Sequence, residues 1–408
     1  MQIYLVGGAV RDRLLGLPVT ERDWVVIGAT GEELQAKGYQ RVGRSFPVYL
    51  HPETQEEYAL ARTETKTDPG YRGFKVCADQ HVTLEQDLAR RDLTINAIAE
   101  TEDGQLIDPY AGQHDLDNRV LRHVSDAFRE DPVRVLRAAR FAARFYEHGF
   151  QLAEETVQLM REMVAAGEID ALIPERVWKE TLRALSTTRP DIFFRVLHET
   201  GALQIIYPEL EALFGVPQPE HWHPEIDTGE HVLMVLHDAA RRNCSDEVRF
   251  AALVHDLGKG TTPQDQWPRH IGHEQRSVEL VKKLCARIGV PNRFRDLAVP
   301  VAKYHTVSHR ATELRPQAIL KVLEALDAFR RPQRLDEFLM ACTADARGRT
   351  GHEEDDYPQA EIFTVALTAA RRVKADELAA SGMKDKALGV AIRNARIAAI
   401  AATRGAGQ

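Results

Sequence analysis

The sequence predicts an α+β fold, with a head built on a small mixed or antiparallel sheet and an all-helical remainder. Two observations predict it. Residues 1 to about 110 contain short apolar runs between turns, such as Ile3–Val6 and Trp24–Ile27, and this pattern is typical of short strands. From about residue 125 the apolar residues recur at helical spacing, and helix starts such as Asp131-Pro132 become frequent. The 408 residues are enough for about two to four domains.

The composition argues against a protein that spans a membrane or depends on disulfides. No apolar run reaches the roughly 20 residues that a membrane-spanning helix needs. Met1 leads almost directly into the first strand, without the regions that define a signal peptide. Cys77, Cys244, Cys285 and Cys342 are far apart and form no Cys-x-x-Cys pair. We therefore expect a cytoplasmic protein with reduced thiols and no membrane partner.

The formal net charge of −8 limits how the chain can bind nucleic acid. Binding to phosphates depends on Lys and Arg side chains, and the overall charge by itself counts against it. Any such surface must be a local basic patch on an acidic protein.

The first strand ends in a glycine turn that predicts an anion site. Gly7-Gly8 follow Val6 directly, and a short helix begins after them and is ended by Gly16 and Pro18. Backbone N–H groups at the start of a helix bind anions. Arg11 would add a positive charge beside them. We expect the site at Gly8 and Arg11.

Glu21 and Asp23 stand at the entrance of the second strand. Two residues apart on an extended chain, their side chains point to the same face. Two carboxylates beside a phosphate site are what two-metal phosphoryl transfer requires. The glycine turn alone, or the acidic pair alone, is more often part of an ordinary turn whose acids face solvent. The two features together favour a catalytic site. Glu57, in a further strand, is either a third metal-binding carboxylate or a solvated residue.

At these residues the chain resembles the nucleotidyltransferase superfamily, specifically the bacterial CCA-adding enzymes, which build or repair the 3′ end of tRNA. The resemblance implies that the Gly-Gly-x-Val-Arg-Asp turn holds the triphosphate and that Glu21 and Asp23 hold Mg²⁺. Glu21 stands where the family usually has Asp, and Glu can also ligate a hard cation through oxygen.

Two further segments belong to this head, which we place at residues 1–124. Thr67–Gly73 is rich in turn-forming residues, and we expect a mobile loop there. Residues 90–97 match the family's Arg-Arg-Asp-x-Thr-x-Asn-Ala motif, and the resemblance implies that Arg91 contacts the nucleotide. Asp108–Gly112 is a matching turn that closes the head.

A basic helix opens the neck, which we place at residues 125–218. Four arginines recur at spacings of three, three and four residues and share one face: Arg134, Arg137, Arg140 and Arg144. On residue pattern alone this is a solvated basic stripe or a ligand-binding face. The resemblance favours the second, because the family's Glu-Asp-x-x-Arg motif occurs at residues 130–134.

In that family the motif lies beside the nucleotide base. The resemblance implies that Asp131 accepts a hydrogen bond from the exocyclic amino group shared by cytosine and adenine, while Arg134 donates to the ring nitrogen. Arg137 and Arg140 would extend the same nucleotide-binding surface. An Asp131 that caps the helix cannot fully serve a base, and the sequence leaves its hydrogen bonds open.

A second constellation predicts a metal site in the region we place at 225–333. His231 opens a helix, the pair His255-Asp256 ends another, and further histidines follow, at His270, His273 and His305. Imidazole and carboxylate ligands suit divalent transition metals or magnesium. The pattern resembles the HD phosphohydrolase domain, which implies His231, His255 and Asp256 as ligands. Thr306 stands where we expect a further acidic ligand, and the helical tail at 334–408 carries no motif.

The resemblance implies template-independent addition of CCA to tRNA from CTP and ATP, with Mg²⁺ in the head. It also implies a phosphohydrolase with a divalent metal (Ni²⁺, Mn²⁺, Co²⁺ or Mg²⁺), acting as phosphatase, 2′,3′-cyclic phosphodiesterase or 2′-nucleotidase. We expect the helical part to bind the tRNA acceptor arm by phosphate and shape contacts, in a monomer or weak homo-oligomer. The alternatives are a poly(A) polymerase and an HD hydrolase whose head only binds nucleotide.

Overall fold

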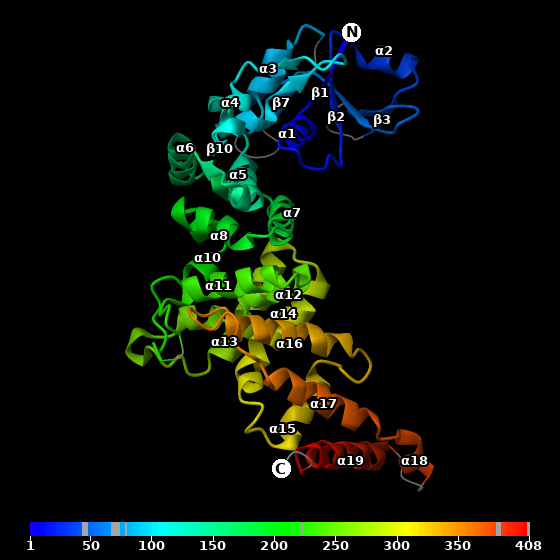
Figure 1. The fold of residues 1–408 in the computed structure, drawn as a ribbon, viewed down its shortest axis with the longest axis vertical. Coiled ribbons are helices and arrows are strands. Elements are labelled where there is room, and N and C mark those ends of the chain that lie inside the picture. Colours follow the sequence, from blue (N-terminus) through cyan, green and yellow to red (C-terminus); the bar gives the residue numbers. More distant parts are fainter. Residues whose placement is uncertain (43–47, 67–73, 78–79, 222, 381–384, 406–408) are drawn as a thin grey trace. The chain divides into compact units, whose positions relative to one another are not determined.

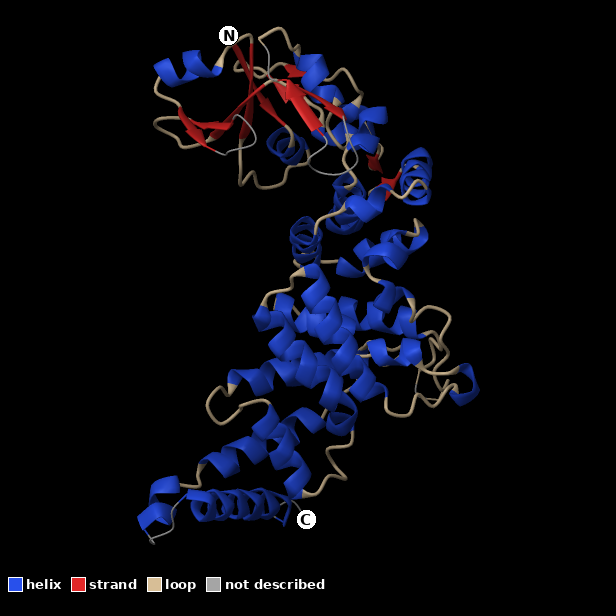
Figure 2. Ribbon diagram, turned by 180° about the vertical axis from the view of Figure 1, so that it is seen from behind, coloured by secondary structure: helices blue, strands red, loops and turns tan. Residues whose placement is uncertain are grey.

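The structure, a computed structural model, describes residues 1–42, 48–66, 74–77, 80–221, 223–380 and 385–405. It consists of two compact units, Met1–Ile206 and Tyr207–Gln408 (Figure 1). All strands among the described residues belong to the first unit (Figure 2). The predicted α+β class, with a sheet-containing head followed by helices, is confirmed. The expected loop at Thr67–Gly73 lies outside the described residues.

A mixed sheet forms the head. In the described part its strand order is β3-β4-β5-β2-β1-β8-β9, and every neighbouring pair is antiparallel except β2 and β5. Two small sheets, β6 with β7 and β10 with β11, accompany it. The strands are β1 (Gln2–Val6), β2 (Asp23–Ile27), β3 (Gln40–Val42), β4 (Val48–Leu50), β5 (Glu57–Leu60), β6 (Thr63–Lys66), β7 (Phe74–Cys77), β8 (Ala99–Glu100), β9 (Leu106–Ile107), β10 (Val120–Leu121) and β11 (Gln151–Leu152).

Helices of the first unit flank this sheet and continue beyond it. The strands expected at Ile3–Val6 and Trp24–Ile27 and the short helix after the glycine turn are confirmed. The helices are α1 (Gly8–Leu14), α2 (Gly31–Ala36), α3 (Leu84–Ala89), α4 (Gly112–Asp117), α5 (Val133–Phe145), α6 (Glu154–Ala165), α7 (Pro174–Leu185), α8 (Pro190–Glu199) and α9 (Ala202–Ile206), with the 3₁₀ segments η1 (Thr94–Asn96), η2 (Asp126–Glu130), η3 (Tyr146–His148) and η4 (Glu168–Ala171).

The second unit is a helical bundle in its described residues. Its helices are α10 (Pro208–Glu211), α11 (Thr228–Arg241), α12 (Asp246–Val254), α13 (His273–Ile288), α14 (Asn292–His309), α15 (Pro316–Ala325), α16 (Gln333–Arg347), α17 (Gln359–Arg371), α18 (Ala375–Ala380) and α19 (Asp385–Gly405), with η5 (Leu257–Thr261) and η6 (Gln264–Gln266). Helix α16 packs against α11, α12 and α14. Over the described residues, none of the helices has the length and apolar character needed to cross a membrane.

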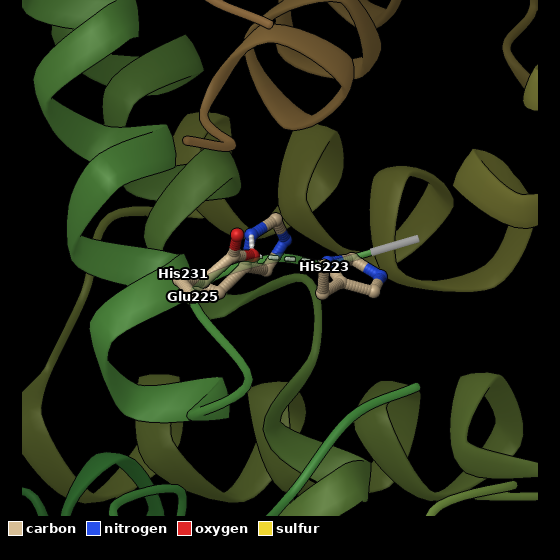
Figure 3. A group of neighbouring side chains, drawn as sticks. All are labelled: His223, Glu225 and His231. Atoms are coloured by element: carbon tan, nitrogen blue, oxygen red, sulfur yellow. Dashed lines mark hydrogen bonds and ion pairs between the residues drawn. The ribbon is translucent and has the colours of Figure 1, made fainter. Parts of the chain in front are cut away.

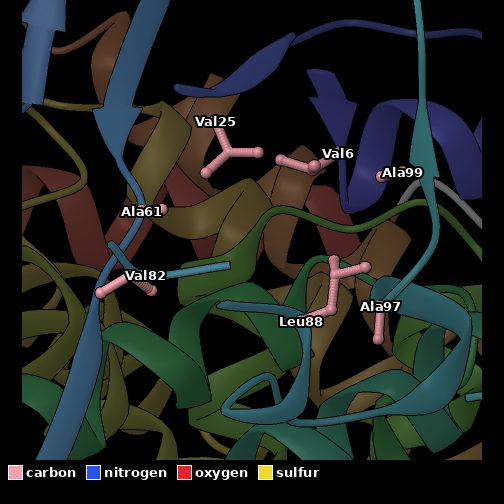
Figure 4. Close-up of a cluster of buried hydrophobic side chains, with 7 residues drawn as sticks. All are labelled: Val6, Val25, Ala61, Val82, Leu88, Ala97 and Ala99. Atoms are coloured by element: carbon pink, nitrogen blue, oxygen red, sulfur yellow. The ribbon is translucent and has the colours of Figure 1, made fainter. Parts of the chain in front are cut away.

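A cluster of small and branched side chains forms the head's core between the sheet and α3 (Figure 4). Its buried members are Val6, Val25, Ala61, Val82, Leu88, Ala97 and Ala99. Leu88 is fully buried, and Val6 and Val25 come from the two strands that flank the glycine turn and the paired acids. The same packing that stabilises the head therefore fixes the ends of β1 and β2.

Leu88→Ala tests this dependence. Removing a buried leucine side chain typically costs about 2–5 kcal/mol, because a cavity remains. We expect the urea midpoint of the first unit to fall accordingly in the full chain, followed by circular dichroism. Leu14→Ala, at a leucine that is 36% exposed, is the matched control, and an equal loss in both variants would contradict the assignment of this core.

Candidate active sites

The glycine turn between β1 and α1 lies beside the side chains of Arg11 and Arg91. Gly7 has φ 72°, and no side chain caps α1. A Cβ atom at Gly7 would lie 2.9 Å from Arg91 Nη1, and one at Gly8 would lie 3.4 Å from Arg11 Nη2. The missing side chains therefore let two guanidinium groups approach the backbone at the start of the helix.

The acidic residues lie at the end of the sheet next to this turn. Asp23 is the first residue of β2, and in the parallel pairing of β2 with β5 it is the register partner of Glu57. Side chains in register on adjacent strands point to the same face. Loss of solvent raises the pKa of Asp23, Arg91 lowers it, and Glu21 raises it again. Glu21 and Arg91 are therefore close enough to Asp23 to shift its pKa, and the strand register places the exposed Glu57 on the same face of the sheet.

A network of polar side chains, buried at its centre and exposed at Arg144, connects the head motifs to α5. Arg137 Nε donates to Asp92 Oδ2 at 2.7 Å, and Arg144 Nη2 donates to Asp12 Oδ2 at 3.0 Å. Between them, Asp12 pairs with Arg11 at 2.7 Å, and Arg11 Nη1 donates to the Asn96 side chain at 2.5 Å. Asn96 Nδ2 closes the path by donating to Asp92 Oδ1 at 2.9 Å. The network, which we call the α5 clamp, consists of Arg11, Asp12, Asp92, Asn96, Arg137 and Arg144.

Two members of the α5 clamp, Arg11 and Asp92, are buried and have shifted pKa values. Arg11 is 3% exposed and lies against the rings of Phe141 and Phe145. Burial lowers the pKa of Arg11, although the Asp12 carboxylate opposes this shift. For Asp92, burial alone would raise the pKa, but Arg137 and Asn96 hold it below the usual range. Asp92 is therefore an anion that fixes Arg137.

The arginines of α5 do not form a solvated stripe. Arg134 and Arg140 are buried. Arg140 Nε donates to Glu180 of α7 at 2.6 Å, and Arg134 Nη2 donates to the Arg90 carbonyl at 2.5 Å. Arg134 Nη1 also donates to the Ala127 carbonyl. The solvated alternative is wrong for these residues, because each guanidinium has a partner inside the first unit.

The Asp131 carboxylate binds the first N–H of α5, from the position before the N-cap residue Pro132, and also pairs with α7. Its Oδ1 accepts from Val133 N at 3.1 Å. Arg176 binds the same carboxylate with both terminal nitrogens, at 3.0 and 2.7 Å. Each carboxylate oxygen can accept more than one hydrogen bond, so the pairing fixes the orientation of Asp131 and leaves acceptor capacity. Arg176 was not singled out by the sequence.

The second site brings the predicted metal ligands together in the helical bundle. His231, His255 and Asp256 are each at most 1% exposed, and one ligand atom from each lies within 4.8 Å of the others. His255 Nε2 lies 3.2 Å from Asp256 Oδ2. Burial alone would lower the pKa of His255, but Asp256 and Asp345 raise it to about 10.

Asp345 of α16 supplies an acid that the sequence analysis missed. Its Oδ1 lies 3.1 Å from His231 Nε2 and 3.6 Å from His255 Nε2. Thr306, where we expected an acid, instead donates to Glu274 at 2.8 Å. The signal for Asp345 was its helical spacing from apolar neighbours, since Phe338, Cys342 and Asp345 share one buried face of α16.

Glu225 orients His231 by contacting Nδ1 of its ring (Figure 3). Its Oε1 lies 2.9 Å from His231 Nδ1 and 3.1 Å from His223 Nδ1. His231 Nδ1 also lies 3.1 Å from the Gly348 carbonyl. Both neighbours of His231 Nδ1 are acceptors, so Nδ1 can donate to them, and Nε2 faces the Asp345 carboxylate. Carboxylates in this position orient metal-binding histidines in many proteins.

Gly258 permits the close packing that completes this site. A Cβ atom there would collide with the His273 carbonyl and lie 2.6 Å from Ser277 N. Glycine therefore lets η5, which follows Asp256, pack directly on the start of α13. Lys259 of the same segment pairs with Asp256 Oδ2 at 2.6 Å.

Three family models match the chain. They are the poly A polymerase head domain at residues 3–122, the probable RNA and SrmB-binding site of polymerase A at 149–214, and the HD domain at 228–332. A multifunctional CCA protein from Thioalkalivibrio sulfidiphilus is 62% identical over 400 residues, covering 98% of both chains. The chain belongs to the multifunctional CCA protein family. A second relative with this name, from Nitrosococcus oceani, is 59% identical over 98% of both chains.

Solved structures share the fold. A CCA-adding enzyme in an apo form aligns with a TM-score of 0.68 at 19% identity, covering 100% of this chain and 92% of that chain. The Thermotoga maritima CCA-adding enzyme complexed with tRNA aligns with a TM-score of 0.66 at 20% identity, covering 97% and 86%. The resemblance to CCA-adding enzymes expected from the sequence motifs is confirmed by the curated relatives, and so is the HD domain.

Proposed function

We propose that the chain adds and repairs the 3′-terminal CCA of tRNA from CTP and ATP, and that its second unit is a metal-dependent phosphohydrolase for tRNA ends. The observation that carries this is the combination, in a multifunctional CCA family member, of a carboxylate and glycine-turn site with a separate buried His and Asp site. Solved CCA-adding enzymes in this fold are complexed with CTP, ATP or tRNA, which supports the same ligands here.

In the head, we assign the triphosphate to Gly8, Arg11 and Arg91 and a divalent metal to Glu21 and Asp23. The metal, when bound, supplies charge that stabilises the attacking and leaving oxygens. Oxygen ligands from carboxylates fit Mg²⁺. The tRNA 3′-hydroxyl attacks the α-phosphorus, the bond to the β-phosphate oxygen breaks, and pyrophosphate leaves.

Asp131 and Arg134 select the base in this proposal. Asp131 keeps acceptor capacity for the amino group of cytosine or adenine, and Arg176 fixes its carboxylate. Arg134 donates to two backbone carbonyls, which fix the orientation of its guanidinium group. Arg137 and Arg140 support this surface through Asp92 and Glu180. Uracil and guanine present a carbonyl where the amino group is needed and are rejected.

In the second unit, we assign a divalent metal to His231, His255 and Asp256, joined by Asp345. The buried Nε2 of His255 lies beside the carboxylates of Asp256 and Asp345, and nitrogen and carboxylate donors gathered in this way fit a cation. Imidazole nitrogens favour Ni²⁺, Mn²⁺ or Co²⁺ over Mg²⁺. We propose phosphate-ester hydrolysis at damaged tRNA ends.

We also propose that the chain has four parts, at residues 1–124, 125–218, 225–333 and 334–408. Helix α16 of the last part packs on the helices of the HD domain.

Giving the chain CTP, ATP and tRNA that lacks CCA tests the proposal against its rivals. We expect addition of two cytidines and then one adenosine. Long adenosine tails would instead identify a poly(A) polymerase. Phosphate release without elongation would identify an HD hydrolase whose head only binds nucleotide.

Asp23→Ala is expected to lower nucleotide incorporation by roughly 1000-fold, since metal stabilisation of the transition state contributes several kcal/mol. Single-turnover extension of tRNA measures this. Hydrolysis by the second unit should persist, and Glu21→Asp should remain active. Asp117→Ala, at an exposed acid of α4, is the control. Near-normal extension by a folded Asp23→Ala chain would overturn the metal assignment.

Asp131→Asn changes base selection with little change in shape. Loss of a good base contact costs about 1–3 kcal/mol of discrimination, or about 5- to 150-fold. We expect UTP to compete with CTP better by that factor, and the same for Arg134→Ala. Competition assays with all four nucleotides measure the ratio. An equal fall for all four would show that these residues act only on structure or on phosphate binding.

His255→Ala should abolish metal-stimulated hydrolysis of 2′,3′-cyclic phosphates and leave CCA addition intact, because the variant removes one ligand of the second unit. His352→Ala, at a partly exposed histidine of the same unit, is the control. Hydrolysis that survives in the folded His255→Ala chain would assign His255 to core packing.

A further inference from the structure

His309, the last residue of α14, binds one oxygen of the Asp345 carboxylate. Its Nε2 lies 2.6 Å from Asp345 Oδ2. The other oxygen, Oδ1, lies 3.1 Å from His231 Nε2 and 3.6 Å from His255 Nε2. An ionised carboxylate only accepts hydrogen bonds, so His309 Nε2 donates to Oδ2. Asp345 therefore has one oxygen that faces the proposed metal ligands and one that is held by His309.

Tyr357 contacts the other nitrogen of the His309 ring. Its hydroxyl oxygen lies 3.1 Å from His309 Nδ1 and 3.1 Å from Ser308 Oγ. A hydroxyl group both donates and accepts, so Tyr357 can donate to Nδ1 while it accepts from Ser308. Burial raises the pKa of Tyr357, so the hydroxyl keeps its hydrogen. Because both ring nitrogens have partners, the orientation of the His309 ring is fixed.

The connection between α16 and α17, residues 348–358, holds Tyr357 in place. At its start, the Gly348 carbonyl lies 3.1 Å from His231 Nδ1. Midway along it, a backbone carbonyl accepts from Arg241 of α11 at 3.1 Å. Near its end, Tyr357 contacts the last turn of α14. The connection thus contacts the proposed metal site at both of its ends.

We propose that His309 and Tyr357 are positioning residues for the metal of the second unit, and that they hold Asp345 so that only Oδ1 binds the ion. This rests on the proposed phosphohydrolase function and deepens it. A hydrogen bond to Oδ2 competes with binding of the ion by both oxygens. A carboxylate that binds through one oxygen leaves a position on the ion open, as catalytic metal sites require.

Co²⁺ titration of the full chain, followed by visible absorption, tests the proposal. Every chain carries Asp23→Ala, which removes a proposed metal ligand of the head. We expect His309→Ala to weaken Co²⁺ binding by about 10- to 100-fold, the usual effect of losing a partner that orients a ligand. The spectrum should change as well, because Asp345 can then bind through both oxygens. His309→Gln keeps an N–H group that can donate to Asp345, and it should recover most of the affinity and the original spectrum.

Tyr357→Phe removes only a hydroxyl group and should weaken Co²⁺ binding less than His309→Ala does. His352→Ala is the matched control, because His352 lies in the same connection and its side chain is 45% exposed. This control should bind Co²⁺ with the parent's affinity. Circular dichroism verifies that each variant is folded, and Tyr357→Phe remains a test if His309→Ala does not fold.

Unchanged affinity and spectrum in His309→Ala and Tyr357→Phe would overturn the proposal. So would a loss in His309→Ala that His309→Gln does not reduce, since His309 would then act only by packing. Co²⁺ binding that depends on His309, in a chain that hydrolyses no phosphate ester, would support the positioning role and contradict only the proposed phosphohydrolase. A parent chain that binds no Co²⁺ would contradict both the metal assignment and the positioning role.

Discussion

The organisation of the first unit depends on one interaction, the ion pair between the buried Asp92 carboxylate and the partly exposed Arg137 side chain. Asp92 also accepts from Asn96, which binds Arg11 beside the glycine turn. A buried charge without its partner costs several kcal/mol, so these residues hold one another in place. Through them a continuous path of hydrogen bonds and ion pairs joins the turn that would bind phosphates to the helix that would bind the base. The proposed selection of the base would also require a fixed Asp131, which Arg176 holds by two hydrogen bonds.

In the second unit, hydrogen bonds likewise fix the side chains that we propose as metal ligands. In each of these histidine rings, one nitrogen lies within hydrogen-bond distance of a backbone carbonyl or the Glu225 carboxylate. The other nitrogen faces Asp256 or Asp345. Helices α11, α13, α14 and α16 each contribute one side chain, so the bundle has to be complete before the site exists. Close packing at Gly258 is one condition for this.

The sequence was sufficient for features that depend on neighbouring residues. Local patterns located the first two strands, the glycine turn and the start of α5, because apolar runs and turn residues act over a few positions. It was insufficient for partners that only the tertiary fold brings together. Arg176 lies 45 residues from Asp131, and Asp345 lies 114 residues from His231. The arginine face of α5 was visible in the spacing, but whether it met solvent or carboxylates depended on Glu180 and Asp92.

The central claim is that protein side chains recognise the nucleotide base by hydrogen bonds. A crystal structure of the chain with CTP, Mg²⁺ and tRNA lacking CCA tests this most directly. We expect the cytosine amino group within hydrogen-bonding distance of the Asp131 carboxylate, the ring nitrogen facing Arg134, and Arg176 still paired with Asp131. A cytosine bound away from α5, or held only through its phosphates, would contradict the account.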